Sequence, residues 1–170
     1  MSLLEAPDSK NGTSGERLES CTSGWHCTPI YRGRTMIVRF FDLEDDANPL
    51  NGSVVADEES LARLLDDLRS REPFVAELRS DNGYVLSMGI GYRVGYVQYS
   101  SADGEPPYLE AIAAAPTHLK RMPTFLCGGT PSPVPRRAVL PFEEAQKIAM
   151  YFLRTGQRSP AVSWGQVGGW

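Results

Sequence analysis

Three short apolar runs follow one another in the middle of the chain, at residues 74–80, 84–90 and 94–100. The second run has a clear period of two, which is typical of a strand with one buried face. The turn Asp81-Asn82-Gly83, a composition that favours hairpins, joins the first two runs, and only three residues separate the second from the third. Strands joined by such short turns are antiparallel, so the region predicts an antiparallel meander.

Two amphipathic helices are predicted on either side of this meander. After Asp57, a plausible N-cap, four leucines at i, i+3, i+4 and i+7 form one apolar face, and Glu72-Pro73 ends the segment. A second helix begins at Pro141 and ends before Gly156, residues that suit the first helical position and the C′ position. The fold class is therefore α+β: a meander sheet with one helix near the N-terminal half and one near the C-terminus packed on it.

Other segments are less regular. Residues 35–41 predict a strand, and residues 107–116 are ambiguous between a short helix and an edge strand. Two further short strands are expected at residues 124–129 and 136–141, joined by a proline-rich linker, and the last residues are expected to be extended. Residues rich in Ser, Gly and Thr dominate the N-terminal end, so we expect a mobile arm over 1–33, one domain over 34–167 and a tail over 168–170.

Charge and composition narrow the function. The net charge of −4, from 17 basic and 21 acidic residues, makes the chain a poor binder of nucleic-acid phosphates. The acidity suits a basic partner, but the commoner reason for such a charge is that it keeps a protein soluble. No apolar run reaches the roughly 18 residues of a membrane span, and no secretory signal is visible. Three cysteines are too few for a disulfide framework. The cytoplasm is the expected compartment, with a non-classical export route left open.

Patterns of enzyme chemistry are weak in this sequence. Cys21, His26 and Cys27 match no zinc spacing, and a Cys127–His118 pair is marked only by its residue types, so Cys127 is better interpreted as a buried strand residue. The acidic run from Asp42 to Asp46 does not match a calcium loop and is expected to be a solvated turn, or else a protein-binding patch. We expect no metal and no cofactor, which favours a binding protein over an enzyme.

The C-terminal half resembles a known family. A glycine-rich hairpin at residues 84–100, a short Phe-Leu-Cys-Gly-Gly strand and the final helix precede a distinctive closing pattern. In that pattern an aromatic-Leu-x-Thr-Gly helix end is followed by x-Arg-x-Pro and a tryptophan. The residues that carry the resemblance are Gly128, Gly129, Pro141, Gly156, Arg158, Pro160 and Trp164. Over residues 34 to 167 the chain is similar to the type-one immunity protein family of bacterial polymorphic toxin systems.

The resemblance implies a non-catalytic α+β protein that binds a cognate toxin, usually of the deaminase superfamily, in the cell that makes it. The partner would then be a zinc-dependent nucleic-acid deaminase; the chain itself lacks the H-x-E and P-C-x-x-C motifs of such enzymes. An acidic partner can cover a positive substrate groove, through an interface of about 1,600 Å². The candidate toxin-binding residues are Asp42, Glu44, Asp45, Asp46, Tyr92, Asp103, Glu105 and Tyr108, with Tyr96 and Tyr99 as further aromatic candidates.

Trp164 is expected to pack the tail onto the sheet or the last helix rather than to contact the toxin. Two other functions stay open at this point. One is an adaptor, or an immunity module for an unrelated toxin such as a nuclease. The other is a small enzyme that uses Cys127, which would require that thiol to be reactive in the folded protein.

Overall fold

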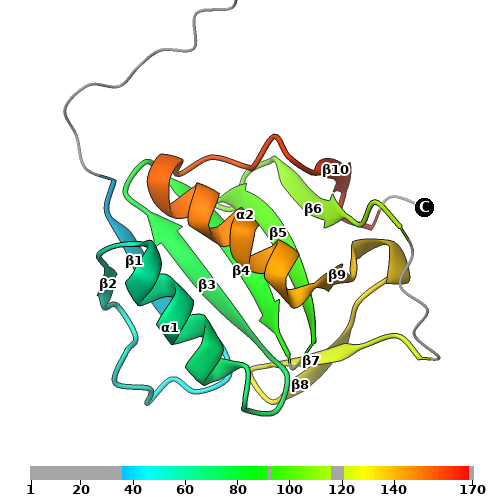
Figure 1. Ribbon diagram of the computed structural model, residues 1–170, viewed down its shortest axis with the longest axis horizontal. Coiled ribbons are helices and arrows are strands. Elements are labelled where there is room, and N and C mark those ends of the chain that lie inside the picture. Colours follow the sequence, from blue (N-terminus) through cyan, green and yellow to red (C-terminus); the bar gives the residue numbers. More distant parts are fainter. Residues whose placement is uncertain (1–35, 92, 116–120, 169–170) are drawn as a thin grey trace, which may run out of the picture. The chain divides into compact units, whose positions relative to one another are not determined.

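The computed structural model describes residues 36–91, 93–115 and 121–168, which lie within the compact unit Arg34–Trp170. Over these residues the chain forms two α-helices, a short 3-10 helix and ten strands that join in one sheet. Both α-helices lie on the same face of the sheet (Figure 1). The α+β fold with an antiparallel meander is thus confirmed.

The meander predicted from the middle of the chain is β3, β4 and β5. The elements are β1 (Val38–Asp42), β2 (Val54–Val55), α1 (Glu58–Leu68), β3 (Phe74–Ser80), β4 (Tyr84–Ile90), β5 (Val94–Ser101), β6 (Tyr108–Ile112), β7 (Thr124–Cys127), β8 (Thr130–Pro133), η1 (Arg136–Ala138), β9 (Leu140–Pro141), α2 (Phe142–Thr155) and β10 (Ser163–Gln166).

The main path of the sheet runs β10-β6-β5-β4-β3-β1-β2, and neighbouring strands along it are antiparallel. A β7–β8 hairpin joins this path through a short parallel pairing of β7 with β3. Because successive side chains of a strand point to opposite faces, the sheet has an inner face toward α1 and α2 and an outer face away from them.

The main core lies between the inner face and the two helices. From the sheet it includes Phe40, Leu78, Leu86, Met88 and Val97, and from the helices Leu61, Leu65, Ile148 and Phe152. A second, smaller cluster packs under the β7–β8 hairpin on the outer face, where Phe125, Val134, Ala138 and Val139 meet Val75, Val94 and Tyr96. This second cluster thus covers the end of the outer face that carries Val75, Val94 and Tyr96.

Two of the three predicted helix signals act as expected, and the third is shifted by one position. Asp57 caps α1, accepting a hydrogen bond from the Ser60 backbone N–H at 2.7 Å. Gly156 ends α2 in the left-handed conformation, with φ of 62°. Pro141 lies one position earlier than expected, at the N-cap of α2. It is also the last residue of β9, which pairs with β5.

Three expectations for the second half need correction. Residues 107–116 contain β6, which is a strand but not an edge, because β10 pairs along its other side. The proline-rich linker holds β8, whose prolines are tolerated because this strand pairs with β7 alone. Residues 136–141 begin with the 3-10 turn η1 before the two-residue strand β9, so they do not form one strand.

Candidate functional site

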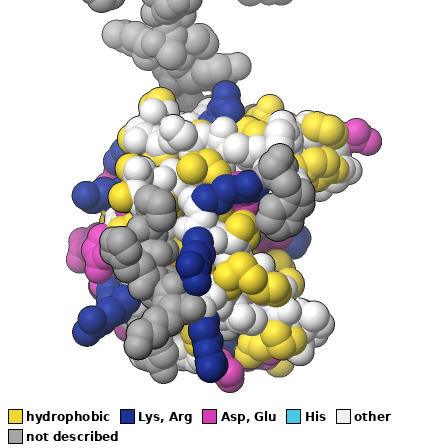
Figure 2. Space-filling view, turned by 90° about the vertical axis from the view of Figure 1, so that its right-hand side faces the viewer, with side chains coloured by type: hydrophobic (Ala, Val, Ile, Leu, Met, Phe, Trp, Pro, Cys, Tyr) yellow, Lys and Arg dark blue, Asp and Glu magenta, His cyan; other side chains and the backbone are white. Residues whose placement is uncertain are grey.

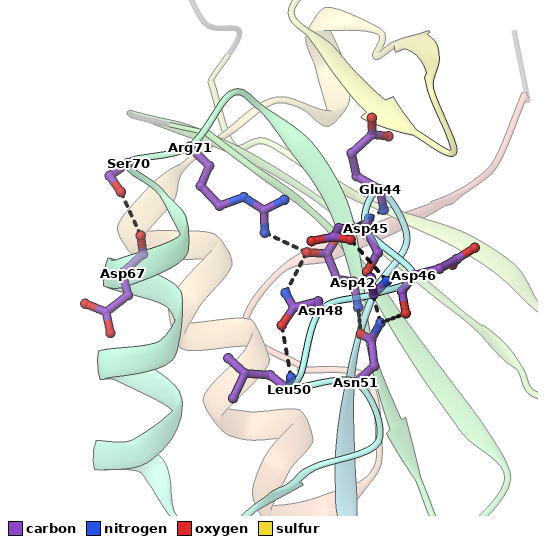
Figure 3. A network of polar contacts seen from close by, with 11 residues as sticks. Asp42, Glu44, Asp45, Asp46, Asn48, Leu50, Asn51, Asp67, Ser70 and Arg71 are labelled. Carbon is purple, nitrogen blue, oxygen red and sulfur yellow. Dashed lines mark hydrogen bonds and ion pairs between the residues drawn. The ribbon is translucent and has the colours of Figure 1, made fainter.

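The acidic turn after β1 is organised around Asp42, whose side chain is buried rather than exposed (Figure 3). One carboxylate oxygen accepts the backbone N–H groups of Glu44 and Asp45, at 2.9 and 3.0 Å. The other accepts the Asn48 amide at 2.8 Å and the Arg71 guanidinium at 2.6 Å. The expectation that Asp42 is a solvated surface residue is wrong, because its inward position on β1 directs it to Arg71, just after α1.

Burial alone would raise the pKa of the Asp42 carboxyl. The hydrogen bonds from Arg71, Asn48 and the two backbone N–H groups outweigh that effect, so the pKa lies below its ordinary value. The Asp42 carboxylate is therefore charged, and its role is structural: it accepts hydrogen bonds from the acidic turn and from Arg71.

Two asparagines complete this loop. Asn51 accepts the backbone N–H of Asp42 at 2.6 Å and donates to the carbonyl oxygens of Asp45 and Asp46. Asn48 also accepts the N–H of Leu50 at 3.0 Å. Sequence reasoning missed both, although asparagines near Pro49 and Gly52 are typical of side chains that hydrogen-bond to their own turn. Their contacts leave the carboxylates of Asp45 and Asp46 exposed.

Glu44 ties the acidic turn to the β7–β8 hairpin. Its carboxylate accepts the N–H of Gly129 at 2.9 Å, and the neighbouring Leu43 carbonyl accepts the N–H of Gly128 at 2.9 Å. The two glycines form the two-residue hairpin loop with φ of 55° and 73°, a geometry that strongly favours glycine at both positions. Part of the candidate binding residue Glu44 is therefore already engaged inside the molecule.

The second acidic candidate is the β5–β6 loop. Asp103 and Glu105 are exposed, as expected, and Asp103 accepts the N–H of Glu105 at 3.0 Å. Hydrogen bonds from the Ser101 side chain and from that N–H lower the Asp103 pKa. Tyr108, at the start of β6, is 39 % exposed. Tyr92, the remaining candidate, lies outside the described residues.

The two acidic segments lie at opposite ends of the sheet. Asp42 pairs with Ala76 near the start of β3. Ser101, which leads into the second loop, pairs with Tyr84, just after the turn that ends β3. The candidate residues thus form two separate groups, and either group can be altered without touching the other.

The β6 side of the molecule also departs from a uniformly acidic surface. Apolar side chains and Lys or Arg side chains are interspersed there, with acidic ones toward the margins (Figure 2). The tyrosines divide as well: Tyr99 is buried in the main core and Tyr96 is half-buried beside the second cluster. Tyr108 alone among the described tyrosine candidates is well exposed.

Comparison with protein families decides the class of protein. The family model described as Immunity protein Imm1 matches residues 51–166, which is more than half of the chain. The chain belongs to the Imm1 family. Membership implies an immunity protein that acts against a toxin, and it indicates a binding protein rather than an enzyme. No curated protein matches the chain.

The closing pattern of this Imm1 member has a structural role. Trp164 lies on β10 and packs on the main core, where its ring meets Tyr99 edge-on at 6.1 Å between centroids. Its indole N–H donates to the Ser159 carbonyl at 2.8 Å, which closes the Arg158–Pro160 bend. The prediction that Trp164 packs the tail onto the sheet is confirmed.

Chemical reactivity finds little support in the described residues of this Imm1 member. Cys127 ends β7 half-buried rather than buried, and burial, followed by the charges of Glu77 and Glu44, raises the pKa of its thiol. A raised pKa disfavours the nucleophilic thiolate. His118 lies outside the described residues. Within them, no three His, Cys, Asp or Glu side chains gather as metal ligands, and no helix could span a membrane.

Proposed function

We propose that this Imm1 member binds a cognate deaminase-type toxin in the cytoplasm of the producing cell and neutralises it by covering its substrate-binding site. The observation that carries the proposal is the family match over residues 51–166, because it makes a toxin the partner. The deaminase class follows from the resemblance of the closing pattern around Trp164. A nucleic-acid deaminase needs a positive groove for its substrate, and a net charge of −4 suits a protein that covers such a groove.

The mechanism is occlusion. A rigid α+β domain presents preformed side chains, displaces water from the toxin surface and excludes the nucleic-acid strand from the active site. An interface of about 1,600 Å² is the ordinary size for such a complex. The zinc of the toxin would stay in the toxin, and the immunity protein would contribute no catalytic group.

Co-expression tests this function. The C-terminal domain of the toxin encoded beside this gene is expressed in bacteria with and without the immunity protein, and survival and co-purification are scored. We expect survival and a stable one-to-one complex, together with loss of deaminated bases in cellular nucleic acid. Death of cells that contain soluble immunity protein would refute the proposal, whereas rescue from a toxin without deaminase activity would refute only the deaminase class.

The exposed carboxylates Asp45, Asp46, Asp103 and Glu105 are proposed to speed association by long-range attraction. Replacing Asp45 and Asp46 with Ser is expected to slow association several-fold and to weaken its salt dependence, measured by stopped-flow mixing with the toxin domain. Asp66→Ser with Asp67→Ser on α1 is the matched control for net charge. Equal effects of both pairs would mean that only total charge matters, not the acidic turn.

A further inference from the structure

The outer face of the sheet carries a continuous line of side chains, of which Val85 is buried, at 6 % exposure, and Ser100 is half-buried, while the others are exposed. Strand pairing sets them side by side across the sheet, and we call this line the outer row. It consists of Val54, Arg39, Arg79, Val85, Ser100 and Tyr108, followed by Val167 just after β10. Six strand spacings of about 4.8 Å make it about 29 Å long. A standard interface of about 800 Å² per partner would cover the whole row together with residues that flank it on both sides.

Exposed apolar side chains concentrate on this face. Six large apolar side chains are exposed in the described residues, and four of them are on the outer face: Ile37, Val54, Tyr108 and Val167, which are 41 %, 52 %, 39 % and 42 % exposed. Ile37 belongs there because it lies two positions before Arg39. Isolated exposed apolar residues need no explanation, but here they come in neighbouring pairs, Ile37 with Val54 at one end of the row and Tyr108 with Val167 at the other.

Two neighbouring residues of the outer row, Arg39 and Arg79, are basic and ordered in advance. The Arg39 guanidinium donates to the Gly52 carbonyl at 2.8 Å. The Arg79 guanidinium donates to the Glu77 carboxylate at 2.7–2.8 Å and lies 4.2 Å from the centre of the Phe41 ring. Ordering long side chains costs entropy on binding, and here most of that cost is already met in the free protein.

One pairing in the outer row places two like charges side by side, and the ion pair of Arg79 with Glu77 offsets part of their repulsion. Arg39 and Arg79 are directly opposite each other on β1 and β3, on the solvent side of the sheet. Like charges in that position destabilise a sheet, and sequences break such local rules chiefly at functional sites. A partner that places hydrogen-bond acceptors between the two guanidiniums would remove this cost.

We propose that the outer row is the surface on which the toxin domain docks. This proposal rests on the proposed function, since the occupant is the toxin. Protein interfaces are enriched in aromatic residues and Arg, which fits Tyr108, Arg39 and Arg79 of the outer row. The carboxylates of Asp103 and Glu105 adjoin the Tyr108 end and form a rim complementary to a basic groove.

The rival surface is the helix layer. Residues 42–72, which hold the acidic turn, β2 and α1, contain ten acidic residues against three arginines. Their net charge is therefore −7, compared with −4 for the whole chain. Solvated charges of this kind govern the rate of encounter more than the strength of the complex. Glu59 and Asp66 of α1, whose side chains are 81 % and 59 % exposed, are highly solvated.

The test compares three double variants of the full chain, each binding the purified C-terminal domain of the neighbouring toxin. The first is Val54→Glu with Tyr108→Glu on the outer row. The matched control is Leu50→Glu with Met122→Glu, two exposed apolar residues of loops outside the row, which adds the same charge. The rival surface is probed by Glu59→Lys with Asp66→Lys. Melting temperatures establish that each variant is folded.

We expect the outer-row pair to raise the Kd at least about 100-fold and the control to change it less than about threefold. If the outer-row pair is unstable, Arg39→Ala with Arg79→Ala replaces it; relief of the like-charge pairing should preserve folding, and the Kd should rise at least about tenfold. If the wild type binds the toxin but the outer-row and control variants change the Kd equally, the proposed docking surface is wrong and the proposed function still stands.

Three other results also decide the question. A wild-type chain that neither binds nor protects overturns the proposed function and the docking surface together. Loss of binding only in the Glu59–Asp66 variant assigns the toxin to the helix layer and overturns the proposal. If the outer-row variant instead converts a dimer to a monomer in sedimentation experiments and keeps its toxin affinity, the outer row binds a second copy, not the toxin.

Discussion

Replacing Asp42 tests the view that this residue holds the acidic turn together. Asp42→Ala removes acceptors from two backbone N–H groups, the Asn48 amide and the Arg71 guanidinium. All four bonds are accepted by a charged carboxylate, where a hydrogen bond contributes about 1.5–3 kcal/mol, but removing that carboxylate also removes the cost of burying its charge. Water partly replaces the bond to Arg71, whose side chain is 36 % exposed. The expected loss of unfolding free energy is therefore about 4 kcal/mol.

The measurement is urea unfolding followed by tryptophan fluorescence. Asp42→Asn keeps one carbonyl acceptor and is expected to cost about 2 kcal/mol, while Asp46→Ala, an exposed carboxylate of the same loop, should stay within about 0.5 kcal/mol. A double-mutant cycle with Arg71→Met isolates the ion pair and should give a coupling of about 1–2 kcal/mol. Asp42→Ala with a loss below about 1 kcal/mol would refute the reasoning.

The pH dependence gives a second check on the same residue. The pKa of Asp42 is lowered in the folded protein, so its contribution to stability is complete above the unfolded pKa of about 3.9. That contribution is lost as the pH falls through the lower folded pKa. The stability gap between the wild type and Asp42→Asn should therefore be constant near neutrality and shrink below about pH 4.

Three other residues carry shorter predictions. Trp164→Ala should cost about 3 kcal/mol and Trp164→Phe about 1 kcal/mol in thermal unfolding, because the second keeps the ring packing and loses only the N–H bond. Gly95→Ala should cost about 2 kcal/mol, since a Cβ there would lie 2.7 Å from Ala145 on α2. Burial, then the charge of Glu110, raises the pKa of Tyr96 to about 12. Burial also raises the pKa of Tyr99, so an alkaline absorbance titration should show late phenols, of which Tyr96→Phe removes one. The stability that the neutral Tyr96 phenol provides is lost as the pH rises through its folded pKa.

Elements with local signals could be predicted from the sequence. The leucine spacing of α1, the Asp57 cap, the Gly156 end of α2 and the hairpin turn between β3 and β4 each depend on residues a few positions apart. The two-residue strand β2 and the proline-bearing strand β8 were missed because neither has a period of its own. Each exists only because a neighbouring strand supplies its hydrogen-bond partners.

The candidate site was less predictable for the same reason. An acidic run gives no sign of which carboxylate turns inward, and for Asp42 that is decided by Arg71, 29 residues away. The Glu44 carboxylate is positioned in the same way by the backbone N–H of Gly129, 85 residues away. The outer row was invisible as a unit, since its members come from β2, β1, β3, β4, β5 and β6 and only the strand register brings them together.

The alternation of β1 shows how one strand can serve stability and recognition separately. Val38 and Phe40 point into the main core, and Arg39 and Phe41 point to the outer face. A one-residue slip would exchange the two sets, so the core fixes the register that aligns the outer row. Outward substitutions away from the second cluster leave that core intact and typically change stability by only about 0.5 kcal/mol. Substitutions at the exposed positions of the outer row are therefore expected to leave the fold unchanged, which the proposed docking surface would require in order to bind a different toxin.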